Sequence, residues 1–178
     1  MPGDEELVVA AGKGNLQAFE TIVVRHQASA WRIACRLLGD PDEARDVVHN
    51  AFLKLLDAAP RYHPTAPFTT YFSRIVVNLC LDHRRRKRHV CADGLSEIED
   101  STPSSLEILL EQERRRAVHE ALATLPPNQR AAIVLRYYEE MGYTEIAEVL
   151  DTSAKAVERL LARGRAALET SLAEWLDM

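Results

Sequence analysis

The chain has 178 residues, of which 47% are hydrophobic and 28% charged, and its formal net charge at pH 7 is −5. This length allows one domain or two small ones. No apolar run reaches the length of a transmembrane helix, and the acidic start MPGDEEL is unlike a secretory signal, so we expect a cytoplasmic protein.

The net charge conceals two basic segments that are separated by an acidic one. Residues 1–92 carry 13 basic and 10 acidic side chains, residues 93–113 carry seven acidic and no basic ones, and the remainder carries nine basic and 10 acidic. The basic segments are HRRRKRH at 83–89 and KAVERLLARGR at 155–165. The local electrostatic field governs nucleic-acid binding more than the total charge does. This pattern therefore predicts a protein that binds one polymer at two distant places.

The three cysteines, Cys35, Cys80 and Cys91, indicate neither a metal site nor a disulfide framework. His89 and Cys91 could share a metal ion, but an isolated pair lacks the further ligands of a structural site. We expect no metal and no cofactor, and we interpret Cys35 and Cys80 as buried thiols.

The predicted elements are helices. Apolar residues recur at three- and four-residue spacing from Phe19 to Gly39, where a first helix ends. A second helix has Asp40 as its N-cap, Pro41 at its first position and Glu43 to complete a capping box. Its expected inward face comprises Ala44, Val47, Val48, Ala51, Phe52 and Leu55.

Three prolines in residues 60–67 predict a loop, because a helix cannot continue through them. A third helix is expected over 68–90. Residues 92–105 are rich in turn-forming and charged residues and predict a linker. Further helices are expected over 105–123, 127–140, 143–150 and 153–174, and the expected buried set of the third helix is Phe68, Phe72, Ile75, Val76, Leu79 and Leu81.

The spacing in 143–165 predicts a helix-turn-helix. Ala147 is small enough for a close helix crossing, Asp151 tolerates the left-handed turn position, and Thr152 is the expected cap of the following helix. Arg159 is the best candidate for a bidentate guanine contact. An ordinary hairpin with a solvated face is the alternative, which Glu158 favours. The residues expected to face a major groove are Ser153, Lys155, Ala156, Arg159, Arg163 and Arg165.

An aromatic loop precedes the basic end of the third helix. Aromatic faces beside a cationic run are typical of surfaces that bind single-stranded nucleic acid. For Phe68 and Phe72 we favour the alternative that they belong to the core. Asn78 and Asp82 lie one helical turn apart, so they share a face. The residues of this candidate surface are Tyr62, His63, Tyr71, Asn78, Asp82, Arg85, Arg86 and Arg88.

Three motifs occur in a fixed order: DPDEARDVVHNAFLKLL at 40–56, FTTYFSRIVVNLCLDHRRR at 68–86, and LPPNQRAAIVLRYYEEMGYTEIAEVLDTSAKAVERLLARGRAAL at 125–168. This series resembles the bacterial RNA polymerase sigma factors of the extracytoplasmic-function (ECF) group over essentially the whole chain. The resemblance implies an all-α protein of two small helical domains, at 1–92 and 113–178, joined by a flexible acidic linker at 93–112.

The resemblance also implies partners and roles. The first domain would bind core RNA polymerase through Asp46, His49, Asn50 and Phe52. It would recognise and melt the minus-ten promoter element with the candidate surface named above, and the loop 61–70 would take a flipped base. The helix 153–167 would read the minus-thirty-five element, and an anti-sigma factor would hold the protein inactive.

Several positions depart from the family pattern. His49-Asn50 stands where Gln-Glu is usual, Tyr71 replaces a common Trp, and the recognition helix reads Val157-Glu158-Arg159 where Lys-Ser-Arg often follows the valine. The change at His49-Asn50 bears on the polymerase contact, and the change in the recognition helix suggests a promoter sequence different from that of better-known members.

Two other functions remain open from the sequence: a sigma-like decoy that titrates an anti-sigma factor, and a helix-turn-helix repressor that acts without polymerase. The basic segments argue against the decoy. An enzyme is not expected, because no nucleophile–base pair or Gly-rich phosphate loop stands out.

The linker length fits a sigma factor, since about 20 residues extend to roughly 66–72 Å and elements two duplex turns apart are separated by roughly 70 Å.

Overall fold

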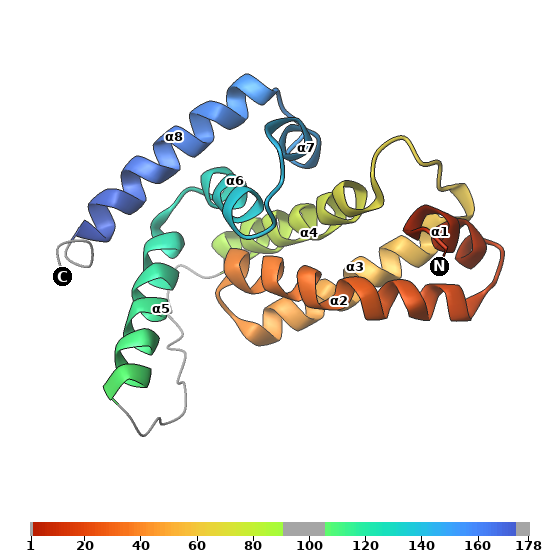
Figure 1. The fold of residues 1–178 in the computed structure, drawn as a ribbon, viewed down its shortest axis with the longest axis horizontal. Helices are drawn as coiled ribbons and strands as arrows, with labels where there is room; N and C mark the ends of the chain where they lie inside the picture. Colours follow the sequence, from red (N-terminus) through yellow and green to blue (C-terminus); the bar gives the residue numbers. More distant parts are fainter. Residues whose placement is uncertain (1, 91–105, 174–178) are drawn as a thin grey trace.

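The computed structural model describes residues 2–90 and 106–173, and in these ranges the fold is all-α (Figure 1). The expected linker at 92–105 lies outside the described residues. The helices are α1 (Asp4–Gly12), α2 (Leu16–Leu38), α3 (Pro41–Ala58), α4 (Phe68–Val90), α5 (Leu106–Thr124), α6 (Pro127–Tyr137), α7 (Tyr143–Val149) and α8 (Ala154–Ser171), with a 3-10 turn η1 (Ala59–Arg61) after α3.

Helices α2, α3 and α4 pack side by side, and α1 lies across one end of them, near the loop that leads into α4 (Figure 1). The predicted C-terminus of α2 and the predicted N-terminus of α3 are confirmed. Gly39 has a φ of 82°, and the Asp40 side chain accepts hydrogen bonds from the backbone N–H groups of Asp42 and Glu43. Short-range capping chemistry therefore sets the α2–α3 corner.

The predicted capping box at Glu43 is wrong. Its carboxylate instead reaches across to α4, where it lies 2.7 Å from Lys87 Nζ and 3.2 Å from His83 Nε2. Helix α1 was not predicted, and it buries Leu7 and Val8 against the bundle.

The core of this bundle is aromatic where α2, α3 and α4 meet. The rings of Phe68 and Phe72 stack with centroids 5.6 Å apart, and Phe52 lies 4.7 Å from Phe72. The prediction that Phe68 and Phe72 belong to the core is confirmed. The prediction that Cys80 is a buried thiol is confirmed, and Val77, which was not among the expected buried residues, is fully buried as well.

The second half contains α5 to α8, with α6 packed against α7 and α8. Helix α5 begins at Leu106, which confirms the helix predicted over 105–123, so the last residues of the expected linker segment 93–112 are helical. Asp151 adopts the predicted left-handed conformation, with a φ of 51°. The predicted cap is wrong by one residue: the side chain of Ser153, not Thr152, accepts a hydrogen bond from Ala156 N.

The two halves are packed against each other, and their buried residues form one continuous core. Helix α7 lies along α4, and α6 packs against α2 (Figure 1). Across this seam, Glu139 Oε2 accepts a hydrogen bond of 2.6 Å from Ser29, and the Arg36 guanidinium lies 3.9 Å from the centre of the Tyr138 ring. Within the described ranges, no helix is both long and apolar enough to cross a membrane.

Candidate nucleic-acid and polymerase interface

Helix α4 presents a coherent polar face toward solvent. Asn78, Asp82, Arg85 and Arg86 are all exposed, and their spacing of four, seven and eight residues places them on one side of the helix. Arg84 points elsewhere, because its Nη1 donates to the backbone oxygen of Leu37 at the end of α2. The predicted minus-ten face is thus available for contact, apart from Arg88, whose side chain lies outside the described residues.

The loop before α4 departs from the expected stacking platform. His63 is exposed, but Tyr62 is only 8% exposed, and its ring packs 5.1 Å from that of the half-buried Tyr71. Burial, with the negative charge of Glu5, raises the pKa of the Tyr62 hydroxyl. The expectation of an exposed Tyr62 is wrong, because this ring closes the end of the core.

Helix α3 carries the residues expected to bind polymerase. Asp46, His49 and Asn50 are exposed and share one face, because they are spaced by three and four residues. Phe52 lies on the opposite side and is 7% exposed, in contact with Phe72. The expectation of a surface contact is therefore wrong for Phe52, which instead supports the helix from inside.

Helix α8 carries the candidate duplex-reading face. Lys155, Arg159 and Arg163 are exposed and lie successively one turn apart. Ser153 begins the helix as its cap, and Ala156 is half-buried beside the same face. Arg165 is not brought to this face, because it borders an apolar groove on another side of α8.

That groove is a feature that the sequence analysis missed. It lies among α5, α6 and α8 and is almost entirely apolar. The sequence contains one signal for it, the adjacent pair Tyr137 and Tyr138, whose rings remain partly exposed after α6 has buried its other apolar residues. The lining residues are Val118, Leu122, Ile133, Tyr137, Tyr138, Arg165, Leu168, Glu169 and Leu172.

The described thiols are poorly suited to act as nucleophiles. Burial raises the pKa of Cys35 to about 11 and that of Cys80 to about 12, so both remain protonated near neutral pH. Within residues 2–90 and 106–173, no group of three or more His, Cys, Asp and Glu side chains could hold a metal ion.

Comparison with known families gives two matches, in the order of the two halves. The family model Sigma-70 region 2 matches residues 22–90, and the model Sigma-70, region 4 matches residues 115–168. The first match contains the candidate faces on α3 and α4, and the second contains the helix-turn-helix.

Similar proteins cover nearly the whole chain. The RNA polymerase sigma-H factor of Pseudomonas aeruginosa is 27% identical over 95% of this chain and 93% of its own. The ECF RNA polymerase sigma-E factor of Escherichia coli K12 is 29% identical over 95% and 94%. Among solved structures, CnrH in complex with the cytosolic domain of CnrY is 30% identical, with a TM-score of 0.72 and coverage of 96% and 97%.

Proposed function

Because the chain belongs to the sigma-70 family, in its ECF group, we propose that it binds core RNA polymerase and directs initiation at specific promoters. It would recognise the minus-thirty-five element as duplex and the minus-ten element as melted DNA. The observation that carries this proposal is the presence of both family regions on one chain, each with an exposed cationic helix face.

The two faces differ in a way that suits two forms of DNA. Helix α8 follows a short turn after α7 and presents Lys155 and Arg159 near its first turns, where a recognition helix meets base edges in a major groove. On α4, the polar pair Asn78 and Asp82 lies beside the Arg85–Arg86 cations. Hydrogen-bonding groups next to cations fit a separated strand, whose bases and phosphates are both accessible.

Strand opening would be driven by binding free energy. Extruding one base costs a few kcal/mol of stacking and pairing, which its capture by protein can offset. The exposed His63 and the loop around it are the proposed place of capture. We infer that the protein has no catalytic chemistry of its own, and that it works where the polymerase is, in the cytoplasm.

We propose the domain limits 1–92 and 113–178, with α5 extending the second domain toward Leu106. Asp46, His49 and Asn50 form the proposed polymerase contact on α3.

An anti-sigma factor is the proposed regulator. This regulation is supported by the 30% identical CnrH, which was solved in complex with the cytosolic domain of a second protein. The apolar groove around Tyr137 and Leu168 is the proposed seat for an apolar helix of such a partner.

In vitro transcription with core polymerase on a library of randomised promoters tests this function. We expect initiation from templates that share two sequence elements about two duplex turns apart. Purified chain that neither associates with core polymerase nor initiates from any template would refute the proposal. Tight, specific duplex binding without polymerase would indicate a repressor instead.

A further inference from the structure

Helix α1 lies before residue 22, where the family match begins, and no function has been described for it above. It packs across the end of the bundle where the chain leaves α3 and enters α4 (Figure 1). Its two ends contact the two ends of the loop 62–67, which contains His63. This arrangement points to a role in placing that loop.

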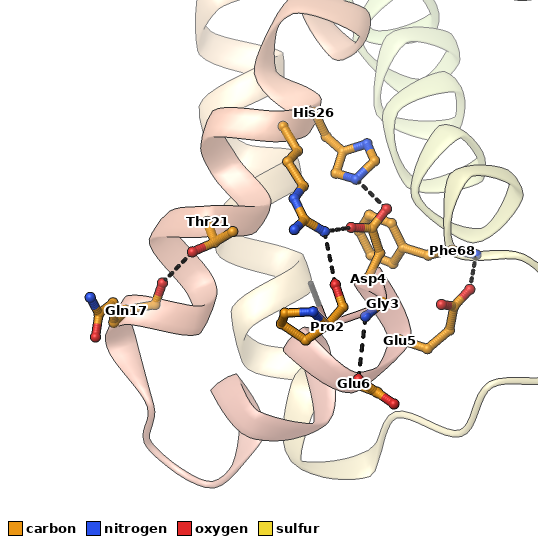
Figure 2. Close-up of polar contacts among 10 residues, drawn as sticks. Pro2, Gly3, Asp4, Glu5, Glu6, Gln17, Thr21, His26 and Phe68 are labelled. Atoms are coloured by element: carbon orange, nitrogen blue, oxygen red, sulfur yellow. Dashed lines mark hydrogen bonds and ion pairs between the residues drawn. The ribbon is translucent and has the colours of Figure 1, made fainter.

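At the exit of the loop, Glu5 caps α4. Its Oε1 accepts a hydrogen bond of 3.0 Å from Phe68 N, the first backbone N–H of that helix (Figure 2). This N–H has no partner within its own helix, and a carboxylate at a helix start is also favoured by the helix dipole. The cap is supplied by another helix, so it fixes where α4 begins relative to α1.

At the entry of the loop, Gly12 brings the end of α1 onto the backbone of η1. A Cβ atom at residue 12 would lie 2.4 Å from Ala59 O and 2.8 Å from Pro60 N, both of which are backbone atoms. Real Cβ atoms do not approach backbone this closely, so only glycine allows the contact. Helix α1 therefore contacts main-chain atoms at both ends of the loop, and these contacts do not depend on the loop's own side chains.

Helix α1 is itself firmly held by α2. Asp4 accepts hydrogen bonds from Arg25 Nη1 at 2.7 Å and from His26 Nε2 at 2.8 Å, and Arg25 also donates to Pro2 O (Figure 2). Burial raises the pKa of the Asp4 carboxyl, but the two hydrogen bonds outweigh this, so the pKa lies below its ordinary value. Asp4 is thus ionised at neutral pH and keeps α1 in place.

We propose that α1 is a positioning element for promoter melting, with Glu5 and Gly12 as positioning residues that fix the loop 62–67 against α4. The proposal rests on the function proposed above. A loop that captures one extruded base must present its pocket within a fraction of an ångström, and a rigid second layer of contacts provides that accuracy. Loss of the Glu5 cap therefore weakens recognition at the minus-ten element and leaves duplex reading by α8 intact.

The test compares Glu5→Ala with Glu6→Ala in the full chain. Glu6 is the neighbouring carboxylate on the same helix, and it accepts a hydrogen bond of 3.3 Å from Gly3 N at the start of α1. Hydrogen exchange without polymerase is the first measurement. In Glu5→Ala the amide of Phe68 and those of the loop should exchange about threefold to tenfold faster, which corresponds to one ordinary hydrogen bond. In Glu6→Ala they should exchange as in the wild type.

Transcription with core polymerase is the second measurement. Glu5→Ala should reduce the preference for a consensus minus-ten element over a substituted one, whereas its preference at minus-thirty-five should not change. Glu5→Gln keeps an oxygen acceptor and should restore most of the minus-ten preference. An equal loss at both elements, or unchanged exchange at Phe68, would overturn the proposal. Failure of the wild type to initiate would refute the proposed function and with it the role of α1 in melting, whereas the exchange result, which does not depend on polymerase, would separately confirm or overturn the positioning of the loop by Glu5.

Discussion

At the residue scale, Arg130 is an unusual component of the seam between the halves. It is 3% exposed, and its Nη1 donates to Leu37 O at 3.0 Å, an oxygen that also accepts from Arg84 Nη1 at 3.1 Å. Its Nε and Nη2 have no partner among the described residues. Burial, with the nearby Arg84 charge, lowers the pKa of Arg130 to about 10. The seam therefore contains a buried cation that has no carboxylate partner among the described residues, and its burial costs folding free energy.

We expect Arg130→Met to change the free energy of unfolding by less than about 1 kcal/mol, because a buried cation can be replaced by an apolar side chain of similar size at little cost. Leu37 O would retain its bond from Arg84. Arg130→Ala, which leaves a cavity, should be destabilising by about 2 kcal/mol or more. Urea unfolding measures both variants. A loss of about 3 kcal/mol in the Met variant would show that the guanidinium stabilises the seam.

Arg159 and Arg165 provide a matched pair on α8. Arg159 lies on the face shared by Lys155 and Arg163, whereas Arg165 borders the apolar groove. Arg159→Ala should reduce discrimination at one base position of the minus-thirty-five element by about 1–3 kcal/mol. Arg165→Ala should leave base preference unchanged. Competition binding of the holoenzyme to single-base promoter variants measures both, and a uniform loss over all variants would assign Arg159 to the phosphate backbone instead.

At the element scale, the start of α8 depends on Ser153. Its hydroxyl accepts from Ala156 N at 3.2 Å, while Thr152 lies one residue outside the helix cap. Ser153→Ala should lower the free energy of unfolding by about 0.5–2 kcal/mol, and Thr152→Ala should have a much smaller effect. Thermal unfolding of the two variants separates the two positions. A larger loss in Thr152→Ala would mean that the helix begins where the sequence alone suggested.

The helices whose ends have local signals were predicted well from the sequence. Gly39 and Asp40 mark the α2–α3 corner, and Asp151 marks the turn of the helix-turn-helix. The signals act within a few residues of the chain, so they can be recognised without the fold. At the α8 cap, two adjacent hydroxyl residues satisfied the same rule, and the backbone conformation decided between them.

The mispredicted residues depend on partners distant in the chain. Glu43 binds α4 rather than its own helix, and Phe52 and Tyr62 turn inward to meet rings from α4. Helix α1 is short and held by contacts with Arg25, His26 and Phe68. None of these pairings leaves a periodic pattern in the sequence. The surface positions on α3, α4 and α8 were predictable because helical spacing alone places them on one face.

At the scale of the whole molecule, the observed arrangement brings the two candidate DNA surfaces together. Arg74, one turn before Asn78 on α4, has Nη2 3.6 Å from Oδ1 of Asp151, the turn residue just before α8. Promoter elements two duplex turns apart are separated by roughly 70 Å. The closed protein therefore cannot read both elements of one promoter, and its halves must separate before both faces can bind.

Glu139 makes polar contacts across the seam. Besides its bond with Ser29, Oε2 lies 3.6 Å from Arg32 Nη2, and the Arg36–Tyr138 contact is adjacent. Its other oxygen, Oε1, is buried without a hydrogen-bond partner in the described part of the chain. The unsatisfied oxygen of Glu139 and the partly unsatisfied guanidinium of Arg130 both lower the stability of the seam, and we expect binding of polymerase and DNA to open it.

Glu139→Lys should open the seam, because it places a cation against Arg32, which Glu139 now attracts, and removes the acceptor of the Ser29 hydrogen bond. Glu140→Lys is the matched control, since it changes the charge equally at an exposed neighbour. Energy transfer between dyes on α3 and α8 should fall in Glu139→Lys alone. Because binding would no longer cost the free energy of opening the seam, this variant should also saturate core polymerase at a lower concentration than the wild type. Unchanged energy transfer would show that apolar packing between α4 and α7, rather than the Glu139 contacts, keeps the halves closed.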